Sequence, residues 1–296
     1  MVVAGVLMGA GAYWWNVRPY DAARLMQCLP AERSLHLYLD VAMLRNGGVL
    51  EKLAGAPTLE DPDYKQFVMD TGFNYRTDLD SVAAAFSDGN EYFVVQGRFN
   101  QAKLAAYAQS HQGRCEHTSC SMPANQPGKT ISFALLRSDL LALAVAKDAR
   151  GSDMIVPGNW KTPPQIPRVA LWISAPPFVF SDSLKVPAGA SSFLTPLAQA
   201  RGTVFTLGPA SNGNTFELRM EVTSASPEDA SNLAKQLSTV TELLKKMLDR
   251  DKMKANPADL SGVLVAGQFQ AQESRVIGVW PIDRSFLDSL VSGKVQ

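Results

Sequence analysis

SVAAAFSDGNEYFVVQG, residues 81–97, predicts two strands and the turn between them. Asp88-Gly89 is a favoured pair for a two-residue β-turn, in which the central residues adopt positive φ angles. The apolar runs on both sides have the length and composition of β-strands. The segment therefore predicts an antiparallel hairpin.

The flanking sequence of the first half predicts further short elements around this hairpin. Leu35, Leu37 and Leu39 alternate at the period of a half-buried strand. Capping residues and glycines bound three helices, and a turn at 137–139 separates two more strands. The helices are predicted at 46–55, 61–72 and 100–113, and the strands at 130–136 and 140–146.

The second half repeats this order of elements. Strand 168–174 precedes a hairpin over 203–222, whose turn is Asn212-Gly213. A long amphipathic helix is predicted from Ser226 onward, because Ser226 and Asp229 form a capping box with Pro227 at the first helical position. Strands at 262–269 and 274–282 and a closing helix at 283–291 complete the series.

Both halves therefore predict an α+β fold of two similar lobes, each with antiparallel strands and packed helices. The halves share the order of elements but almost no residue identity, so an internal duplication is a hypothesis from that order alone. Eight of the prolines fall between Pro157 and Pro196, which indicates a linker between the lobes and a long surface loop at 174–193. The predicted divisions are an anchor with its juxtamembrane segment (1–27), a first lobe (28–155), a Pro-rich linker (156–167) and a second lobe (168–296).

The N-terminal stretch MVVAGVLMGAGAYWW carries no charged side chain. A helix over Val2–Trp15 measures about 21 Å, which is short for a bilayer core of about 30 Å. An uncleaved membrane anchor, a signal peptide cleaved near Ala10-Gly11-Ala12 and a buried helix are the three interpretations. We favour the anchor, with residues 2–17 in the inner membrane and the soluble part in the periplasm, although the arginines that follow would favour the cytoplasm.

Gly5 and Gly9 form a G-x-x-x-G pair on one face of this helix. Small residues at that spacing let two membrane helices approach closely, which suggests a protein partner in the membrane. The alternative is that small residues are simply common in membrane helices.

The stretch GFNYRTDLDSVAAAF, residues 72–86, resembles a segment of uncharacterised, membrane-anchored bacterial envelope proteins. In those proteins a Gly-hydrophobic-Asp/Asn stretch leads into Asp-Leu and then into a strand. The resemblance covers about the first lobe. It implies an envelope location and an α+β fold, and it brings no catalytic residue.

RCEHTSC, residues 114–120, places two cysteines and a histidine within seven positions. Facing residues of an antiparallel hairpin lie about 4.5–5.5 Å apart at Cα, so Cys115 and Cys120 are suitably placed for a disulfide. A metal site would add His111 and His117 as ligands, but this spacing matches no common zinc motif. We favour the disulfide over free thiols and over metal.

Other polar residues give weaker signals of chemistry. Asp78 and Asp80 are candidates for a cation site or a carboxylate pair, and more simply for favouring a helix N-terminus. His36 lies in a predicted strand as a half-buried side chain. Cys28 is most simply a buried thiol, and the alternative is an intermolecular bridge between anchored chains. Gly128-Lys129-Thr130 is not a phosphate loop, because a strand follows it and position 123 is proline.

Charge and motifs together favour a non-enzymatic protein. Lys plus Arg and Asp plus Glu number 28 each, with no basic run that would attract nucleic acid. No cofactor motif is present, so we expect none. The leading hypothesis is a periplasmic binding or scaffold module of the cell envelope. The alternatives are an accessory subunit docked through its N-terminal helix, and a hydrolase or metal-dependent enzyme using His117 or the aspartates Asp78 and Asp80.

Overall fold

The hairpin predicted at 81–97 is present in the computed structural model of the chain, as β2 (Leu79–Ser87) and β3 (Asn90–Gly97). Asp88 and Gly89 connect the strands with φ values of 50° and 75°. This is the left-handed conformation that a type I′ turn requires. The turn chemistry expected from the sequence is therefore confirmed.

The structure describes most of the chain beyond its first residues. The described ranges are 20–31, 33–53, 62–162, 164–181, 188–210 and 216–291.

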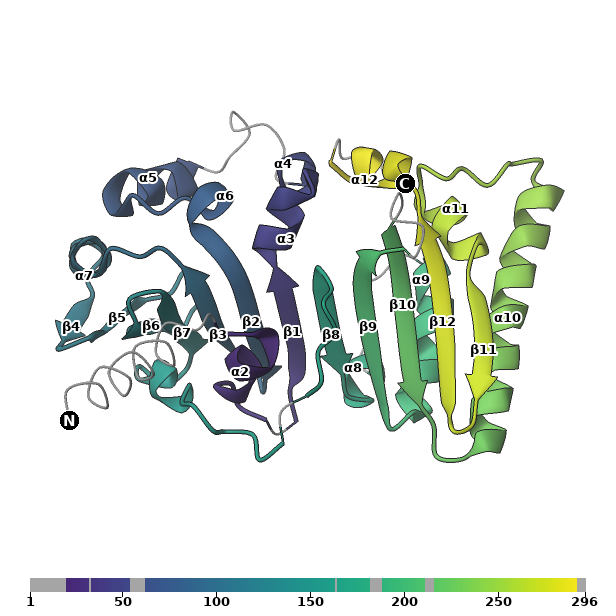
Figure 1. Ribbon diagram of the computed structural model, residues 1–296, viewed down its shortest axis with the longest axis horizontal. Helices are drawn as coiled ribbons and strands as arrows, with labels where there is room; N and C mark the ends of the chain where they lie inside the picture. The colour runs from purple at the N-terminus through teal and green to yellow at the C-terminus, as the bar shows by residue number, and fades with distance from the viewer. Residues whose placement is uncertain are drawn as a thin grey trace, which may run out of the picture.

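Twelve strands form one antiparallel sheet in this part of the chain. Besides β2 and β3 they are β1 (Leu35–Asp40), β4 (Arg114–Glu116), β5 (Ser119–Pro123), β6 (Thr130–Arg137), β7 (Leu140–Ala146), β8 (Leu171–Ala175), β9 (Gly202–Pro209), β10 (Phe216–Thr223), β11 (Gln268–Gln272) and β12 (Arg275–Ile282). Their order is β11-β12-β10-β9-β8-β1-β2-β3-β7-β6-β5-β4, which Figure 1 shows from right to left.

The two halves of the chain meet where β1 pairs antiparallel with β8. Moving away from this junction, the first half runs β1, the β2–β3 hairpin, then β7 and β6. The second half runs β8, the β9–β10 hairpin, then β12 and β11. The α+β class is confirmed, and the two halves share one hydrogen-bonded sheet.

The segment predicted as a linker packs against the first half. The backbone N–H of Val156 donates to the carbonyl of Cys28 at 3.0 Å, and the Asn159 side chain donates to the same carbonyl at 2.9 Å. The division into lobes at 156–167 remains a prediction. These contacts attach the segment to the end of α2 in the first half.

Helices cover both faces of the sheet. They are α2 (Ala22–Gln27), α3 (Val41–Asn46), α4 (Val49–Leu53), α5 (Pro62–Thr71), α6 (Tyr75–Asp78), α7 (Gln101–Ser110), α8 (Phe178–Ser181), α9 (Ala188–Leu194), α10 (Pro227–Arg250), α11 (Leu260–Val265) and α12 (Arg284–Val291). The 3₁₀ turns η2 (Gly151–Met154) and η3 (Thr195–Gln199) also lie in the described part of the chain.

We define the front face of the sheet as the one on which α2 packs. Leu25 and Met26 of α2 are fully buried there, in a core that includes Tyr38 and Trp172. The segment 22–27, assigned to the anchor part from sequence, therefore belongs to the folded core. This burial removes a large apolar area from water, at about 25 cal/mol per Å².

The back face carries the largest core, which α10 covers in the second half. Leu237 of α10 is fully buried in this core, together with Met220 and Trp280 of the sheet. In the first half α7 packs on the same face, where Leu104 meets Phe133. On the front face, α2 covers the first half of the sheet and does not extend over the second half (Figure 1).

Two expectations from the sequence were wrong. Residues 262–265, predicted as strand, belong to α11, because the Asp259 side chain accepts a hydrogen bond from Gly262 N at 3.1 Å and caps a helix there. The expected surface loop at 174–193 contains helical segments instead. Phe193 and the following Leu197 are buried in the main core, so this region is part of the packing.

Candidate functional site

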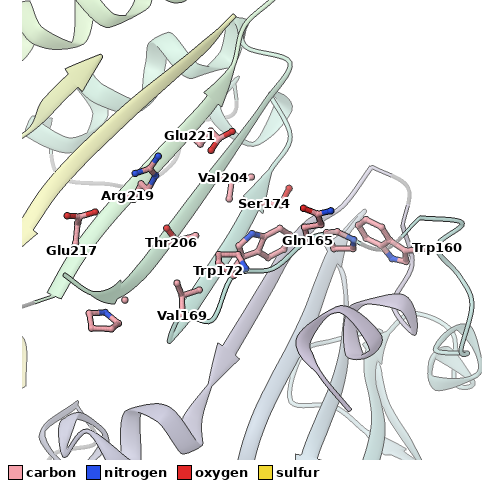
Figure 2. Close-up of a pocket in the computed structure, with 14 residues that line it drawn as sticks. Trp160, Gln165, Val169, Trp172, Ser174, Val204, Thr206, Glu217, Arg219 and Glu221 are labelled. Atoms are coloured by element: carbon pink, nitrogen blue, oxygen red, sulfur yellow. The ribbon is translucent and has the colours of Figure 1, made fainter. Parts of the chain in front are cut away.

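A cleft of about 570 Å³ opens on the front face of β8, β9 and β10, beside the junction of the two halves. Figure 2 shows Trp160 and Gln165 at one end and the charged side chains of β10 at the other. Its volume lies within the range typical of small-molecule sites. It is lined by Trp160, Pro164, Gln165, Pro167, Val169, Trp172, Ser174, Val204, Thr206, Gly208, Pro209, Glu217, Arg219 and Glu221.

The floor of the cleft follows from strand register. Trp172, Thr206 and Arg219 lie opposite one another on three neighbouring strands. Such a row spans two strand spacings, or about 10 Å, and its side chains share one face. The same pairing places Ser174, Val204 and Glu221 opposite one another in the next row. The register therefore brings an aromatic residue and a charged residue together across the sheet.

The aromatic end of the cleft is rigid. The Trp160 Nε1–H donates to the backbone carbonyl of Leu29 at 3.0 Å. His36 meets the same indole edge-on, with 4.8 Å between ring centroids. Trp172 is buried except for 4% of its surface. These contacts fix both indoles before any ligand arrives, which lowers the entropy lost on binding.

The charged end lies on β10, where Glu217, Arg219 and Glu221 alternate along one face at about 6.8 Å intervals. Glu221 pairs with Arg275 of β12 at 2.9 Å. Glu217 and Arg219 form no ion pair or hydrogen bond with another described residue. A guanidinium and a carboxylate are therefore both available to a ligand.

Gly208 shapes the wall between these ends. A Cβ atom at this position would lie 3.1 Å from Cγ1 of Val169, which is closer than ordinary contact. The missing side chain lets Val169, in the segment that leads into β8, lie close against β9. This packing brings Pro167 and Val169 to the rim of the cleft.

The charged residues in the lining of the cleft are Glu217, Arg219 and Glu221. The two carboxylates and the two guanidiniums at its charged end, counting Arg275, balance in formal charge. It contains no histidine, cysteine or lysine. Among the described residues no group of three or more His, Cys, Asp or Glu is placed to hold a metal ion.

The predicted disulfide between Cys115 and Cys120 is confirmed. The two residues face each other on β4 and β5, with 4.0 Å between their Cα atoms. His117 sits in the turn between them with a φ of 56°, and His111 follows the end of α7. The two histidines and the disulfide lie away from the cleft, in a different part of the sheet.

The aspartates proposed as a site are separated by their ion pairs. Asp78 pairs with Arg98 at 3.2 Å and accepts a hydrogen bond from Asn74 N at 2.9 Å. Asp80 pairs with Arg45 at 2.8 Å. Each carboxylate thus has its own cation, and they do not form a shared site.

Two further groups are buried. His36 is 4% exposed, and its Nε2–H donates to the carbonyl of Pro30 at 2.8 Å. Burial lowers the pKa of His36 below its ordinary value, and the hydrogen bond to Pro30 opposes this shift in part. Cys28 is a buried free thiol, and burial raises its pKa to about 11. Neither has the exposure that a nucleophile or general base requires.

Gly5 and Gly9, the helix-packing candidates, and the anchor through residues 2–17 lie outside the described residues. No helix in the described ranges is long and apolar enough to cross a membrane. The Gly128-Lys129-Thr130 stretch forms a turn before β6, and Lys129 pairs with Glu91 at 3.4 Å.

The cleft itself was missed from the sequence. Its aromatic wall comes from the segment that was predicted to be a linker, and its charged floor comes from alternate residues of a predicted strand. The alternation Glu217-x-Arg219-x-Glu221 was the available signal, since charges on one face of a strand indicate that this face is open.

Comparisons with known proteins add little. No family model and no curated protein matches the chain. Crystal form III of TP0453 is 13% identical over 93% of this chain and 99% of that chain, with a TM-score of 0.46. For crystal form I of TP0453 the identity is 14%, the coverage 91% and 97%, and the TM-score 0.43. Identities and TM-scores this low do not establish a shared fold or a shared function.

Proposed function

We propose that the chain is a non-enzymatic binding module of the bacterial cell envelope. Residues 2–17 would hold it in the inner membrane, with the sheet in the periplasm, and the front-face cleft would take up a small elongated ligand. The observation that carries this proposal is the cleft, with its fixed indoles at one end and, at the other, Arg219 and Glu217, which have no ion pair with any other described residue.

The periplasmic location is supported by the disulfide. Disulfides persist in oxidising compartments and are rare in the cytosol, so Cys115–Cys120 favours the periplasmic side of the membrane. The resemblance of residues 72–86 to membrane-anchored envelope proteins agrees with this location.

Binding is favoured over hydrolysis by the state of the titratable groups. His36 is buried against Pro30, and the carboxylates Asp78 and Asp80 are each occupied by an arginine. A general base must reach the proton that it removes. His36 lacks that access and the two aspartates are held in ion pairs, whereas the cleft is open.

The ligand class follows from the polarity of the cleft along its length. Trp160, Pro164 and Val169 form an apolar wall at one end. Arg219 and Glu217 at the other end match an acceptor and a donor about 6.8 Å apart. We therefore expect an uncharged or zwitterionic molecule with a flat apolar part and a polar end.

A cleft-filling variant tests this function. Thr206→Trp places an indole in the middle of the floor, and Thr239→Trp places the same side chain on the exposed surface of α10 as a control. Small molecules extracted from each purified full-length chain are compared by mass spectrometry. We expect a compound that co-purifies with wild type and with the control and that is lost from Thr206→Trp. The same compounds in all three samples, or none in any, would refute the cleft as a binding site.

The location is tested separately with topology reporters. A reporter that is active only outside the cytoplasm is fused after residue 31, and in a second fusion after residue 162. Activity of both fusions is expected. Activity of a cytoplasmic reporter at the same positions would overturn the periplasmic assignment.

Internal duplication is a further part of the proposal. It is supported by the equal order of strands on the two sides of the β1–β8 junction. If the halves share an origin, related chains should show higher identity between halves than this one does. The test is to compare the halves within such chains, aligned at the Asp88-Gly89 turn and at Asn212-Gly213, the turn predicted from the sequence, which lies outside the described residues. Halves that stay unrelated in every chain would contradict it.

A further inference from the structure

The floor of the front-face cleft continues across the sheet beyond the cleft itself. Strand register sets Trp172, Thr206 and Arg219 in one row, on β8, β9 and β10. Pairing with β12 and β11 extends the row to Val279 and Gln268. Five strands in a row span four strand spacings, or about 19 Å. The cleft floor covers only the first two of these spacings, so the surface open to a ligand is longer than the cleft.

We call the cleft floor, together with the front-facing residues of β10, β12 and β11, the polar strip. In Figure 1 the centres of β10 and β12 face the viewer, and no described helix lies in front of them. Long polar side chains predominate on these three strands. The front-facing residues are Glu217, Arg219, Glu221, Thr223, Arg275, Ile277, Val279, Pro281, Gln268, Gln270 and Gln272. Ile277 is only 7% exposed, because the long side chains beside it in the register cover it.

Glutamines supply the hydrogen-bonding groups at the outer end of the polar strip. Gln268, Gln270 and Gln272 alternate along β11 at intervals of about 6.8 Å, and all three are exposed. None of them forms a hydrogen bond with another described residue. Each side-chain amide offers a carbonyl acceptor and an NH₂ donor. This end of the strip can therefore both donate and accept hydrogen bonds without carrying a charge.

The charge of the polar strip disfavours a charged polymer as its ligand. The carboxylates of Glu217 and Glu221 balance two guanidiniums in formal charge. The guanidiniums are those of Arg219 and Arg275, and no lysine is among the front-facing residues of β10, β12 and β11. Nucleic acid and anionic lipid surfaces are bound mainly through an excess of basic side chains. A ligand without net charge suits this surface better.

The apolar content of the polar strip disfavours a folded protein as its partner. The centre of a stable protein interface is rich in large apolar side chains. In the described part of the chain, the exposed side chains of this kind lie on α5, on α8, along and after α10, and at 154–156. None of them belongs to the strip. The strip instead offers closely spaced amides, carboxylates and guanidiniums, which suit a ligand covered with hydroxyl groups.

We propose that the polar strip binds an uncharged oligosaccharide chain that lies across the strands from Trp160 to Gln270. A sugar ring has hydroxyls along its edge and C–H groups on its face. The C–H face would pack on the fixed indole of Trp160, and hydroxyls would bind Arg219, Glu217 and the β11 amides. The inference rests on the proposed function, because it names the ligand class of the same cleft. It adds that the ligand extends beyond the cleft onto β11.

Isothermal titration calorimetry of the full-length chain, in a detergent without a sugar headgroup, tests the ligand class. The probes are the neutral tetrasaccharides cellotetraose, maltotetraose and chitotetraose, with glucose and N-acetylglucosamine as the matching monosaccharides. We expect at least one tetrasaccharide to bind, and to bind at least about tenfold more tightly than its monosaccharide, because only the longer chain also reaches β11. Binding of none of the three would overturn the proposal. A monosaccharide that binds as tightly as its tetrasaccharide would overturn it as well.

Substitutions on β11 test how far the ligand reaches. Gln268 and Gln270 are exposed and do not line the cleft. The double variant Gln268→Ala, Gln270→Ala should weaken tetrasaccharide binding about tenfold, since it removes two hydrogen-bonding side chains. The matched control is Gln101→Ala, Gln126→Ala, which removes two exposed glutamines from the first half. The control should bind the tetrasaccharide as wild type does.

The cleft-filling variant Thr206→Trp separates failure of this inference from failure of the proposed function. We expect Thr206→Trp to lose tetrasaccharide binding. If it does so while the β11 double variant binds as wild type does, the cleft remains the binding site and the extension onto β11 is overturned. If wild type and both variants bind the tetrasaccharide equally, the sugar binds elsewhere, and the cleft and the polar strip both fail.

Discussion

At the scale of single residues, the burial of His36 makes the stability of the fold depend on pH. The folded protein keeps this imidazole neutral against Pro30, with its pKa lowered by burial. The unfolded chain takes up a proton near the ordinary pKa of about 6.5. Below that pH the unfolded state binds more protons, so stability falls as the pH falls, until the pKa of the folded state is passed.

The prediction for His36 is a drop in melting temperature between pH 7 and pH 5. His36→Gln can keep a donor to Pro30 but does not titrate, so its melting temperature should change less over this range. Thermal unfolding followed by circular dichroism at matched ionic strength measures both. Parallel curves for the two proteins would show that His36 does not cause the pH dependence.

The disulfide is the second feature at this scale. Cys115 and Cys120 close a loop of six residues, which corresponds to a stabilisation of about 2 kcal/mol in the chain-entropy model. The double variant Cys115→Ser, Cys120→Ser should lose about this free energy of unfolding in urea titrations. Reductant should destabilise wild type by a similar amount and leave the double variant unchanged. An equal response of both proteins to reductant would contradict this account.

At the scale of elements, the start of α10 depends on one hydroxyl. The Ser226 Oγ accepts a hydrogen bond from the backbone N–H of Asp229 at 3.1 Å. Ser226→Ala leaves that donor without its cap and should cost about 1 kcal/mol of stability. Ser226→Asn can keep the cap and should cost less. Urea unfolding of the three proteins measures the order, and equal losses for both variants would mean that the cap is not responsible.

Local chemistry explains which elements were predictable from the sequence. The Asp88-Gly89 turn and the Ser226 cap depend on neighbouring residues, and both were predicted where the structure has them. The strand predicted at 262–265 depended on an apolar run that fits a buried helix as well as a strand. The Asp259 cap and tertiary packing together favour the helix, since Asp259 accepts a hydrogen bond from Gly262 N and Val263 is buried in the main core.

At the scale of the whole molecule, the β1–β8 pairing predicts that both halves unfold together. Trp172 of β8 packs in the same core as Tyr38 of β1, so losing one half exposes the other. Leu237→Ala in α10 should cost about 2–5 kcal/mol. It should also lower the hydrogen-exchange protection of β2 and β3, in the other half, at the same urea concentration as that of β9 and β10. Two separate transitions would instead favour independent lobes divided at 156–167.

The cleft also belongs to this scale, which is why the sequence did not predict it. Trp160 and Arg219 are 59 positions apart (219 − 160) and lie on one cleft only because β8, β9 and β10 align in register. The disulfide was predictable because its two residues are local in the chain. Long-range register depends on the entire sheet, and no short motif encodes it.

The most direct test of the central claim is a native mass spectrum of the full-length chain, gently extracted from its own membrane. The claim is that the sheet faces an oxidising compartment and holds a small ligand in its front-face cleft. We predict a protein mass lower by two hydrogens, from Cys115–Cys120, together with a retained non-protein mass. A spectrum with three free thiols and no bound molecule would contradict both parts of the claim.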